Sequence, residues 1–391
     1  MLTSLALIFL CGLLTAALFQ KLRLPALIGM LITGIILGPH ALNLLDGSIL
    51  AISADLRRLA LIIILTRAGL SLDVSELRQV GRPAILICFV PACFEIAGVM
   101  LLAPRLLHIS RLEAAIVGAV IAAVSPAVVV PKMLHLMEAR IGTAKSIPQM
   151  IMAGASVDDV FVIVIFTAAV GFAQSGTVSA ASALQIPISL VTGIAVGLAA
   201  GTAISEFFTR TRLRNSLKIL SLLSVSFLLV ALEDAQLFPF SGLIAVMVAG
   251  MAIQRRAPVM AAKLALKYSK LWVGAEVLLF VLVGAAVNVG YARVAGFAAV
   301  AVIFCALMTR VLGVYVSLIK TALNGRERLF CMLAYTPKAT VQAAIGSVPL
   351  ALGLPYGEIV LTVAVLSILI TAPLGALLID ATQARLLTRD E

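Results

Sequence analysis

The sequence has few charged residues, which sets it apart from soluble globular proteins. Only 12% of its 391 residues are Asp, Glu, Lys or Arg, while 62% are hydrophobic. Soluble domains average about 25% charged and about 45–50% apolar residues. A chain with so little charge cannot cover the surface of a soluble fold, so most of it must lie in a lipid bilayer. This composition excludes a sizeable soluble domain and indicates a polytopic membrane protein.

The motifs that soluble enzymes use for cofactors are missing as well. The sequence contains no phosphate-binding loop, no dinucleotide fingerprint and no Cys/His metal motif, and its three histidines lack metal-ligand spacing. The five cysteines are odd in number and lie in or beside apolar segments, which indicates packing rather than disulfides. We therefore expect no cofactor, no nucleotide and no enzymatic activity.

The chain contains a series of long apolar segments instead. Thirteen of them are long enough, or nearly long enough, to cross a membrane. The first is interpreted as a span rather than a removable signal peptide, because it has neither a basic start nor a small-residue cleavage site. The expected spans are residues 2–20, 24–39, 52–72, 83–104, 113–134, 148–173, 184–208, 218–233, 241–254, 271–289, 295–319, 328–353 and 357–380.

The distribution of Lys and Arg supports this set of spans. Of the 29 basic residues, 21 lie in the C-terminal tail or in alternate loops and the span ends beside them, five lie in or beside the opposite loops, and three lie deeper inside spans. Basic loops favour the cytoplasmic side of a membrane. The pattern predicts a multi-pass protein of the cell (inner) membrane with its N-terminus outside and its C-terminus in the cytoplasm. It also explains the net charge of +11 without a nucleic-acid partner.

A weak internal symmetry divides the chain into two halves around the seventh span. In each half the fifth span is interrupted by proline and polar residues, at 123–131 and 334–346, and the fourth carries a lone charge, Glu95 or Arg310. Inverted halves with interrupted helices at matching places are typical of secondary transporters, whose site lies near the bilayer midplane. We therefore predict an all-α fold with an inverted repeat of two six-helix halves and two crossed discontinuous helices.

Two adjacent carboxylates, Asp158 and Asp159, lie within an apolar span. Each costs about 2.5–3.5 kcal/mol at a membrane centre, so such residues face a cavity, a partner or an ion. Neighbouring side chains on a helix diverge by about 100°, which favours one paired and one open aspartate. The protonation of two neighbouring carboxylates in a low dielectric is coupled. A proton and a cation can then occupy the pair as alternatives. The pair is predicted to bind protons and a cation; the alternative is a purely structural ion pair with Lys338.

Three further charges at membrane depth accompany the aspartates. Lys338 follows Pro337 in an interrupted span, where it compensates charge either as a fixed counter-ion or as a group that also releases its proton. Glu95 and Arg310 are predicted to form a structural ion pair, because arginine keeps its proton at any working pH. Three hydroxyl side chains are candidate ligands to the cation: Ser125, Ser156 and Thr340.

Five segments together resemble the NHA-type branch of the cation/proton antiporter superfamily. They are AVSPAVVVPKMLHL, GASVDDVFVIVIF, TRVLGVYVSL, PKATVQAAIGSV and VLSILITAPLGALLI, in the family's order and spacing over residues 20–380. The double aspartate and the PKATVQAAIG run are the specific parts. The resemblance implies a sodium or lithium ion/proton antiporter with a role in pH homeostasis.

The resemblance also implies roles for single residues. Asp159 is expected to bind the sodium ion or the proton, Asp158 is expected to pair with Lys338, and the Glu95–Arg310 pair is expected to hold the core together. No charged position departs from the family's pattern.

The resemblance further implies a homodimer in the lipid membrane and elevator-type alternating access, in which a core slides past a dimerisation panel. The panel is expected at 1–82 and 216–292, the core at 83–180 and 293–391, and a linker helix at 181–215.

Two other transport functions are alternatives on the same fold. Potassium/proton antiport is one, because carbonyl and carboxylate ligands suit both ions and the size of the cavity decides between them. Sodium-coupled symport of an organic anion is the other, although an anion beside the aspartate pair needs an added positive charge. Intramembrane aspartic proteases carry their two aspartates on two helices, one within Gly-x-Gly-Asp, a pattern that GASVDD lacks.

Overall fold

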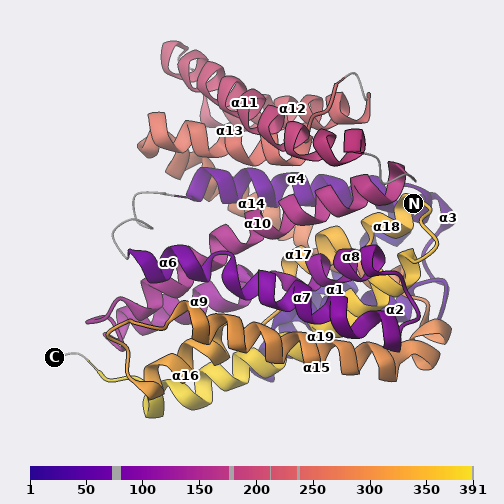
Figure 1. The fold of residues 1–391 in the computed structure, drawn as a ribbon. Helices are drawn as coiled ribbons and strands as arrows, with labels where there is room; N and C mark the ends of the chain where they lie inside the picture. Colours follow the sequence, from indigo (N-terminus) through magenta and orange to yellow (C-terminus); the bar gives the residue numbers. More distant parts are fainter. Residues whose placement is uncertain (73–80, 176–179, 212, 236–237, 390–391) are drawn as a thin grey trace. The chain divides into compact units, whose positions relative to one another are not determined.

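The computed structural model describes residues 1–72, 81–175, 180–211, 213–235 and 238–389, with positions 156, 175, 180–187 and 291–295 described by their backbone alone. These residues form α-helices joined by turns and loops, and no β-strand occurs among them (Figure 1). The predicted all-α fold is therefore confirmed.

The chain divides into two compact units. The first comprises Met1–Asp55, Ser75–Phe166 and Val277–Glu391, and the second comprises Leu56–Val74 and Thr167–Glu276. The helices of the first unit are α1 (Leu2–Lys21), α2 (Ala26–Leu37), α3 (Gly47–Ala51), α6 (Arg82–Ile87), α7 (Val90–Leu106), α8 (Arg111–Ala122), α9 (Pro126–Glu138), most of α10 (Ile147–Ser175), the end of α14 (Pro258–Ala285), α15 (Val289–Ser317), α16 (Gly325–Ala334), α17 (Thr340–Gly346), α18 (Val348–Ala351) and α19 (Gly357–Leu386).

The second unit contains the remaining helices. They are α4 (Ser53–Ser71, apart from its first turn), the end of α10, α11 (Ala180–Arg210), α12 (Asn215–Asp234), α13 (Gly242–Arg256) and most of α14. Within this unit α13 packs against α11 and α12.

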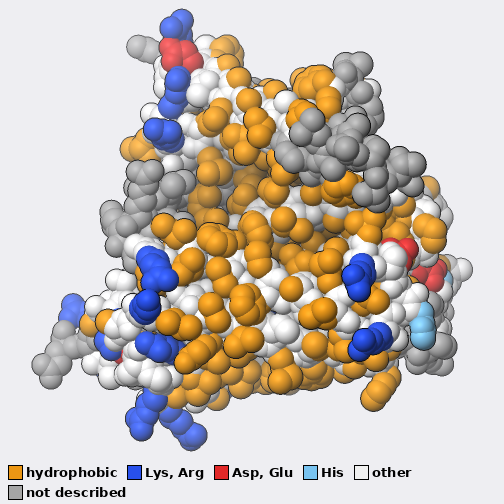
Figure 2. All heavy atoms as spheres, viewed as in Figure 1, with side chains coloured by type: hydrophobic (Ala, Val, Ile, Leu, Met, Phe, Trp, Pro, Cys, Tyr) orange, Lys and Arg blue, Asp and Glu red, His pale blue; other side chains and the backbone are white. Residues whose placement is uncertain are grey.

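Nine helices in the described ranges are long and apolar enough to cross a membrane. The other four expected spans correspond to α2, α4, α13 and the interrupted series α16–α18. Figure 2 shows hydrophobic side chains across much of the face in view, and several are largely exposed, such as Phe297 (89%) and Leu101 (78%). Such exposure suits a lipid-facing surface, and the total of thirteen spans stays a prediction.

The tenth span begins earlier than expected. Its helix α14 starts at Pro258 rather than near residue 271. Proline is favoured in the first helical turn, and the residues that follow it, VMAAKLALKYSK, are mostly good helix formers. The basic residues at 263, 267 and 270 therefore lie on a helix and not in a loop.

The two interrupted spans are broken where the sequence places proline. Helix α8 ends at Ala122 and α9 begins at Pro126, while α16 ends at Ala334 and α17 begins at Thr340 after Pro337. A residue before proline is disfavoured in the α conformation, so the chain becomes extended there. We call residues 123–125 the first break and residues 335–339 the second break. The predicted pair of discontinuous helices is confirmed.

Close packing between α7 and α15 sets the geometry of the site. A Cβ atom at Gly98 would lie 2.5 Å from Oγ1 of Thr309, and one at Gly313 would lie 2.7 Å from Cα of Pro91. Only glycine permits such contact between helices. Because α7 and α15 touch along their length, Glu95 on one helix reaches Arg310 on the other.

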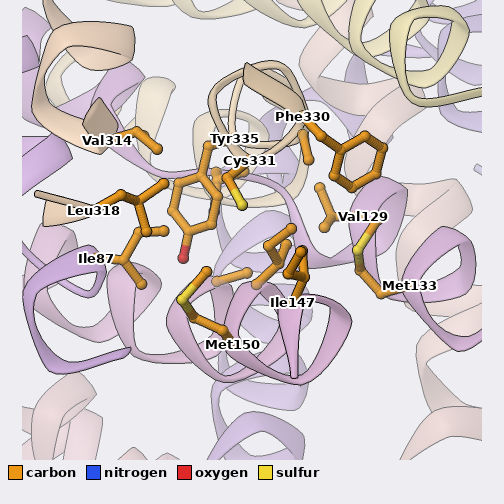
Figure 3. Packing of buried hydrophobic residues seen from close by; sticks show 14 of the residues in the cluster. Ile87, Val129, Met133, Ile147, Met150, Val314, Leu318, Phe330, Cys331 and Tyr335 are labelled. Carbon is orange, nitrogen blue, oxygen red and sulfur yellow. The ribbon is translucent and has the colours of Figure 1, made fainter. Parts of the chain in front are cut away.

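An apolar cluster lies directly beside the second break. Figure 3 shows the ring of Tyr335 among side chains from α6, α9, α10, α15 and α16, including Ile87, Met150 and Val314. All three are buried, and so are Cys331 and Tyr335. The cluster holds the end of α16 firmly against α10, the helix that carries both aspartates.

Candidate ion-binding site

Four buried charged side chains form a continuous series of ion pairs. Nζ of Lys338 lies 2.6 Å from Oε2 of Glu95, and the same oxygen lies 2.8 Å from Nη1 of Arg310. Nη2 of Arg310 lies 2.7 Å from Oδ2 of Asp158. None of the four residues is more than 1% exposed. Two positive and two negative charges alternate, so this network of Lys338, Glu95, Arg310 and Asp158 is neutral, as charges buried from water must be.

The guanidinium of Arg310 also contacts the second break and the end of α8, next to the first break. Nε donates a hydrogen bond to the carbonyl oxygen of Tyr335 at 2.7 Å, and Nη1 donates to the carbonyl oxygen of Ala122. The planar guanidinium presents five N–H donors in fixed directions, which an ammonium group cannot reproduce. Arg310 therefore joins the end of α8 to the end of α16.

Side chains from other helices and the backbone of the second break satisfy backbone groups of the first break. The amide of Gln342 donates to the carbonyl oxygen of Ala123 at 2.8 Å, and the N–H group of Val124 donates to Oδ2 of Asp158 at 2.8 Å. The N–H group of Ser125 donates to the carbonyl oxygen of Pro337 at 2.8 Å. A break buried in a membrane protein is tolerated only when such partners replace the lost helical hydrogen bonds.

The second break is held by the side chains of Arg310 and Thr371. The N–H group of Lys338 donates to Oγ1 of Thr371 on α19 at 2.9 Å. The carbonyl oxygens of Tyr335 and Pro337 accept from Arg310 and Ser125, as described above. The two breaks thus contact each other directly, which makes the discontinuous helices a crossed pair.

The two adjacent aspartates have different surroundings. Asp158 is fully buried, and its Oδ2 accepts hydrogen bonds from Arg310 and Val124. Asp159 is partly exposed, and its Oδ1 is buried without a hydrogen-bond donor in the described part of the chain. No Lys or Arg nitrogen within that part forms an ion pair with Asp159. This agrees with the expectation of one paired and one unpaired aspartate.

Lys338 has a different partner from the one that the resemblance implies. Its ammonium group pairs with Glu95, while Asp158 pairs with Arg310. The reason is the contact between α7 and α15, which brings Glu95 and Arg310 into the middle of the group. The expected Glu95–Arg310 pair is present, but it is one link of a longer network.

The structure describes the side chains of two of the three candidate hydroxyl ligands, and both are buried. Oγ of Ser125 is buried and has no hydrogen-bond partner among the described residues, and Thr340 is buried at the start of α17. The side chain of Ser156 lies outside the part of the structure that is described.

Gln342 belongs to the site, although the sequence did not single it out. It is fully buried on α17 and bridges to the first break. The available signal was an amide side chain in an otherwise apolar helix, TVQAAIG. In the part of the chain that the structure describes, six buried oxygen atoms around the crossed helices have no hydrogen-bond partner: Oε1 of Glu95, Oγ of Ser125, Oδ1 of Asp158, Oδ1 of Asp159, the hydroxyl of Tyr335 and Oε1 of Gln342. Oxygen atoms of these kinds suit protons and hard cations.

Two ion pairs at the surface of the first unit anchor the helices beside the breaks. Nζ of Lys132 on α9 lies 2.5 Å from Asp380 on α19, and Nζ of Lys145 lies 2.8 Å from Glu327 on α16. The lysine side chains are 33% and 38% exposed, so solvent weakens both pairs.

A cavity of about 430 Å³ lies in the second unit, near the ends of α11 and α13 and the starts of α12 and α14. Lys218 and Lys263 line it together with Phe208 and Met260. None of the candidate site residues belongs to it.

Comparisons with known proteins agree with this architecture. The family model described as "Sodium/hydrogen exchanger, transmembrane" matches residues 5–382. Sodium/hydrogen exchanger 9B2 of Mus musculus is 33% identical over 98% of this chain and 73% of its own length, and that of Homo sapiens is 35% identical over 94% and 71%. The solved structure of the sodium proton antiporter MjNhaP1 from Methanocaldococcus jannaschii matches with a TM-score of 0.84 over 98% of both chains, at 21% identity, and so supports the fold.

Proposed function

Because this chain belongs to the sodium/hydrogen exchanger family, we propose that it is a secondary active antiporter that exchanges sodium, or lithium, for protons. The family is one of transporters, so no covalent chemistry is required. The substrates would be the ions themselves.

One observation carries this proposal. Asp159 is a carboxylate beside a network whose charges already balance, and its buried oxygen has no donor in the described chain. An uncompensated carboxylate at membrane depth is costly, and binding either a proton or a monovalent cation removes that cost. The two occupants compete because one carboxylate charge is neutralised by either of them. Competition of this kind is what exchange of the two ions requires.

Asp158 would support this site from a fixed position. Its Oδ2 is held by Arg310 and Val124. The other oxygen, Oδ1, has no donor among the described residues and would bind the cation together with Asp159. Ser125 and Thr340 are the hydroxyl ligands that we propose, with Ser156 as a third from the sequence pattern. Lys338 would compensate charge through Glu95.

Transport would follow alternating access of the elevator type. We propose a mobile core of residues 83–180 and 293–391, a panel of residues 1–82 and 216–292 that forms a homodimer, and a linker at 181–215. The site would be closed to one side at a time by movement of the core past the panel. The N-terminus would lie outside the cell membrane and the C-terminus in the cytoplasm, as the distribution of Lys and Arg predicts.

The test is antiport in proteoliposomes with an internal pH indicator. Addition of sodium or lithium to the purified protein should move protons in the opposite direction, and Asp159→Asn should reduce this signal to that of protein-free liposomes. Asp55→Asn, which makes the same chemical change at an exposed aspartate of α4, is the matched control and should retain the wild-type rate.

Three outcomes would contradict the proposal. Full activity of Asp159→Asn would exclude this carboxylate as the site. A response to potassium alone would make the protein a potassium/proton antiporter. Sodium uptake that requires an organic anion would make it a symporter.

A further inference from the structure

One peptide group in the first break is held from both sides. Its carbonyl oxygen, on Ala123, accepts a hydrogen bond from Nε2 of Gln342 at 2.8 Å. Its N–H group, on Val124, donates to Oδ2 of Asp158 at 2.8 Å. The side chain on α17 and the carboxylate on α10 are therefore linked through a single amide plane, and polarisation along such a chain strengthens both hydrogen bonds.

The orientation of the Gln342 amide is fixed by its partners. A carbonyl oxygen cannot donate, so only the NH₂ end of the amide can face the oxygen of Ala123. The same NH₂ group lies 3.5 Å from the carbonyl oxygen of Ile121, the second acceptor at the end of α8. Oε1 of Gln342 is buried and has no donor among the described residues. The side chain is fully buried, so no solvent competes for these contacts.

We propose that Gln342 is a positioning residue of the ion site. It sets the direction of the peptide N–H group that holds Asp158, although Gln342 comes from the opposite half of the chain from both aspartates. This inference rests on the proposed function for its transport measurement, but the contact itself is tested independently below.

Rotation of the peptide between Ala123 and Val124 would change the affinity for the cation more than the rate at which the protein moves. Without the amide of Gln342, the carbonyl oxygen of Ala123 loses its donor and the plane of the peptide is held on one side only. Asp158 then keeps its hydrogen bond from Arg310, but the N–H group of Val124 points less directly at its carboxylate. Because ligand geometry must be held closely for a cation to bind well, the apparent affinity for sodium should fall.

Two substitutions separate the donor from the shape of the side chain. Gln342→Met keeps the length and removes both polar atoms. Gln342→Glu keeps the shape, but its ionised form places an oxygen without a hydrogen against the carbonyl oxygen of Ala123, so at alkaline pH it should be the more damaging of the two. Gln149→Met is the matched control, because Gln149 on α10 also has a buried Oε1 without a partner among the described residues, and no described hydrogen bond joins its side chain to either break.

The measurements are the sodium dependence of antiport in proteoliposomes and hydrogen–deuterium exchange of the segment 119–129. For Gln342→Met we expect an increase of about three- to tenfold in the sodium KM, the factor that one hydrogen bond typically contributes. The maximal rate should stay within about twofold, since no charge of the network changes. Exchange at 119–129 should be faster than in the wild type, while Gln149→Met should match the wild type in both measurements.

The remaining outcomes overturn the inference. An unchanged sodium KM in both Gln342 variants, or unchanged exchange at 119–129, would exclude positioning through this peptide. Equal losses of rate and thermal stability without a change in KM would make Gln342 a packing residue only. If the wild type transports neither sodium, lithium nor potassium, the proposed function fails, and the exchange measurement alone decides whether Gln342 orders the break.

Discussion

The two breaks occupy matching places in the two halves of the chain, but they are built differently. The first, Ala-Val-Ser at 123–125, contributes no charged side chain and is held mainly by side chains from elsewhere. The second, at 335–339, carries the charge of Lys338 and offers its own carbonyl oxygens as acceptors. A repeat therefore preserves the position of an interruption without preserving its chemistry. The first break donates a backbone hydrogen bond to Asp158, and the second supplies the ammonium group of Lys338 to the network.

The largest expected effect is at Arg310, because its guanidinium joins the end of α8, next to the first break, to the second break. Arg310→Met should destabilise the protein by about 3–5 kcal/mol, since it leaves Asp158 without its buried counter-ion and Glu95 with only one. Thermal unfolding in detergent measures the loss. Arg210→Met is the control, because the pair that Arg210 forms with Glu206 is exposed and its loss should have little effect. A wild-type melting temperature for Arg310→Met would show that the network is dispensable.

Lys338 tests the charge that distinguishes the second break. Lys338→Met removes a charged hydrogen bond to Glu95, but Glu95 keeps Arg310, so the cost should be smaller, about 1.5–3 kcal/mol. Because the ammonium group of Lys338 forms its ion pair with Glu95 and not with either aspartate, sodium-dependent proton movement should remain measurable in the variant. Complete loss of exchange at unchanged thermal stability would instead place Lys338 in the transport step itself.

The smallest expected effect concerns the backbone of the second break. Thr371→Val keeps the shape of the side chain but removes the oxygen that accepts from the N–H group of Lys338. One buried hydrogen bond of this kind contributes about 1 kcal/mol, so a small decrease in melting temperature and a near-normal sodium KM are expected. Thr382→Val is the control, because the hydroxyl of Thr382 bonds only to its own helix. A raised KM in Thr371→Val would mean that both breaks position the ion.

The parts of the fold that depend on local sequence were predicted well. Proline marked both breaks, and the apolar runs marked the helices on either side of them. The contrast between a paired and an unpaired aspartate followed from helical geometry alone, because adjacent side chains point in different directions. The start of α14 was missed because its first three turns are basic as well as helix-forming, and the basic residues were interpreted as a loop.

The partners within the network depended on packing that the sequence does not show. Lys338 is 243 positions from Glu95 in the chain, and their pairing follows from the close contact of α7 with α15 at Gly98 and Gly313. Gln342 was missed for the same reason, since its role depends on which face of α17 meets the end of α8. Residue types indicated the chemistry of the site, while tertiary contacts determined which side chains pair with each other.

The neutrality of the buried network has a consequence for work against the membrane voltage. Its four charges cancel, so the occupant of Asp159 alone decides the charge of the group that would cross the bilayer. A proton and a sodium ion leave that group equally neutral, and the voltage then acts on neither loaded form. The empty form carries one negative charge, whose transfer through 100 mV involves about 2.3 kcal/mol. Exchange of one sodium ion for one proton would thus be insensitive to voltage, and a voltage that drives anions to one side would bias only the unloaded carrier.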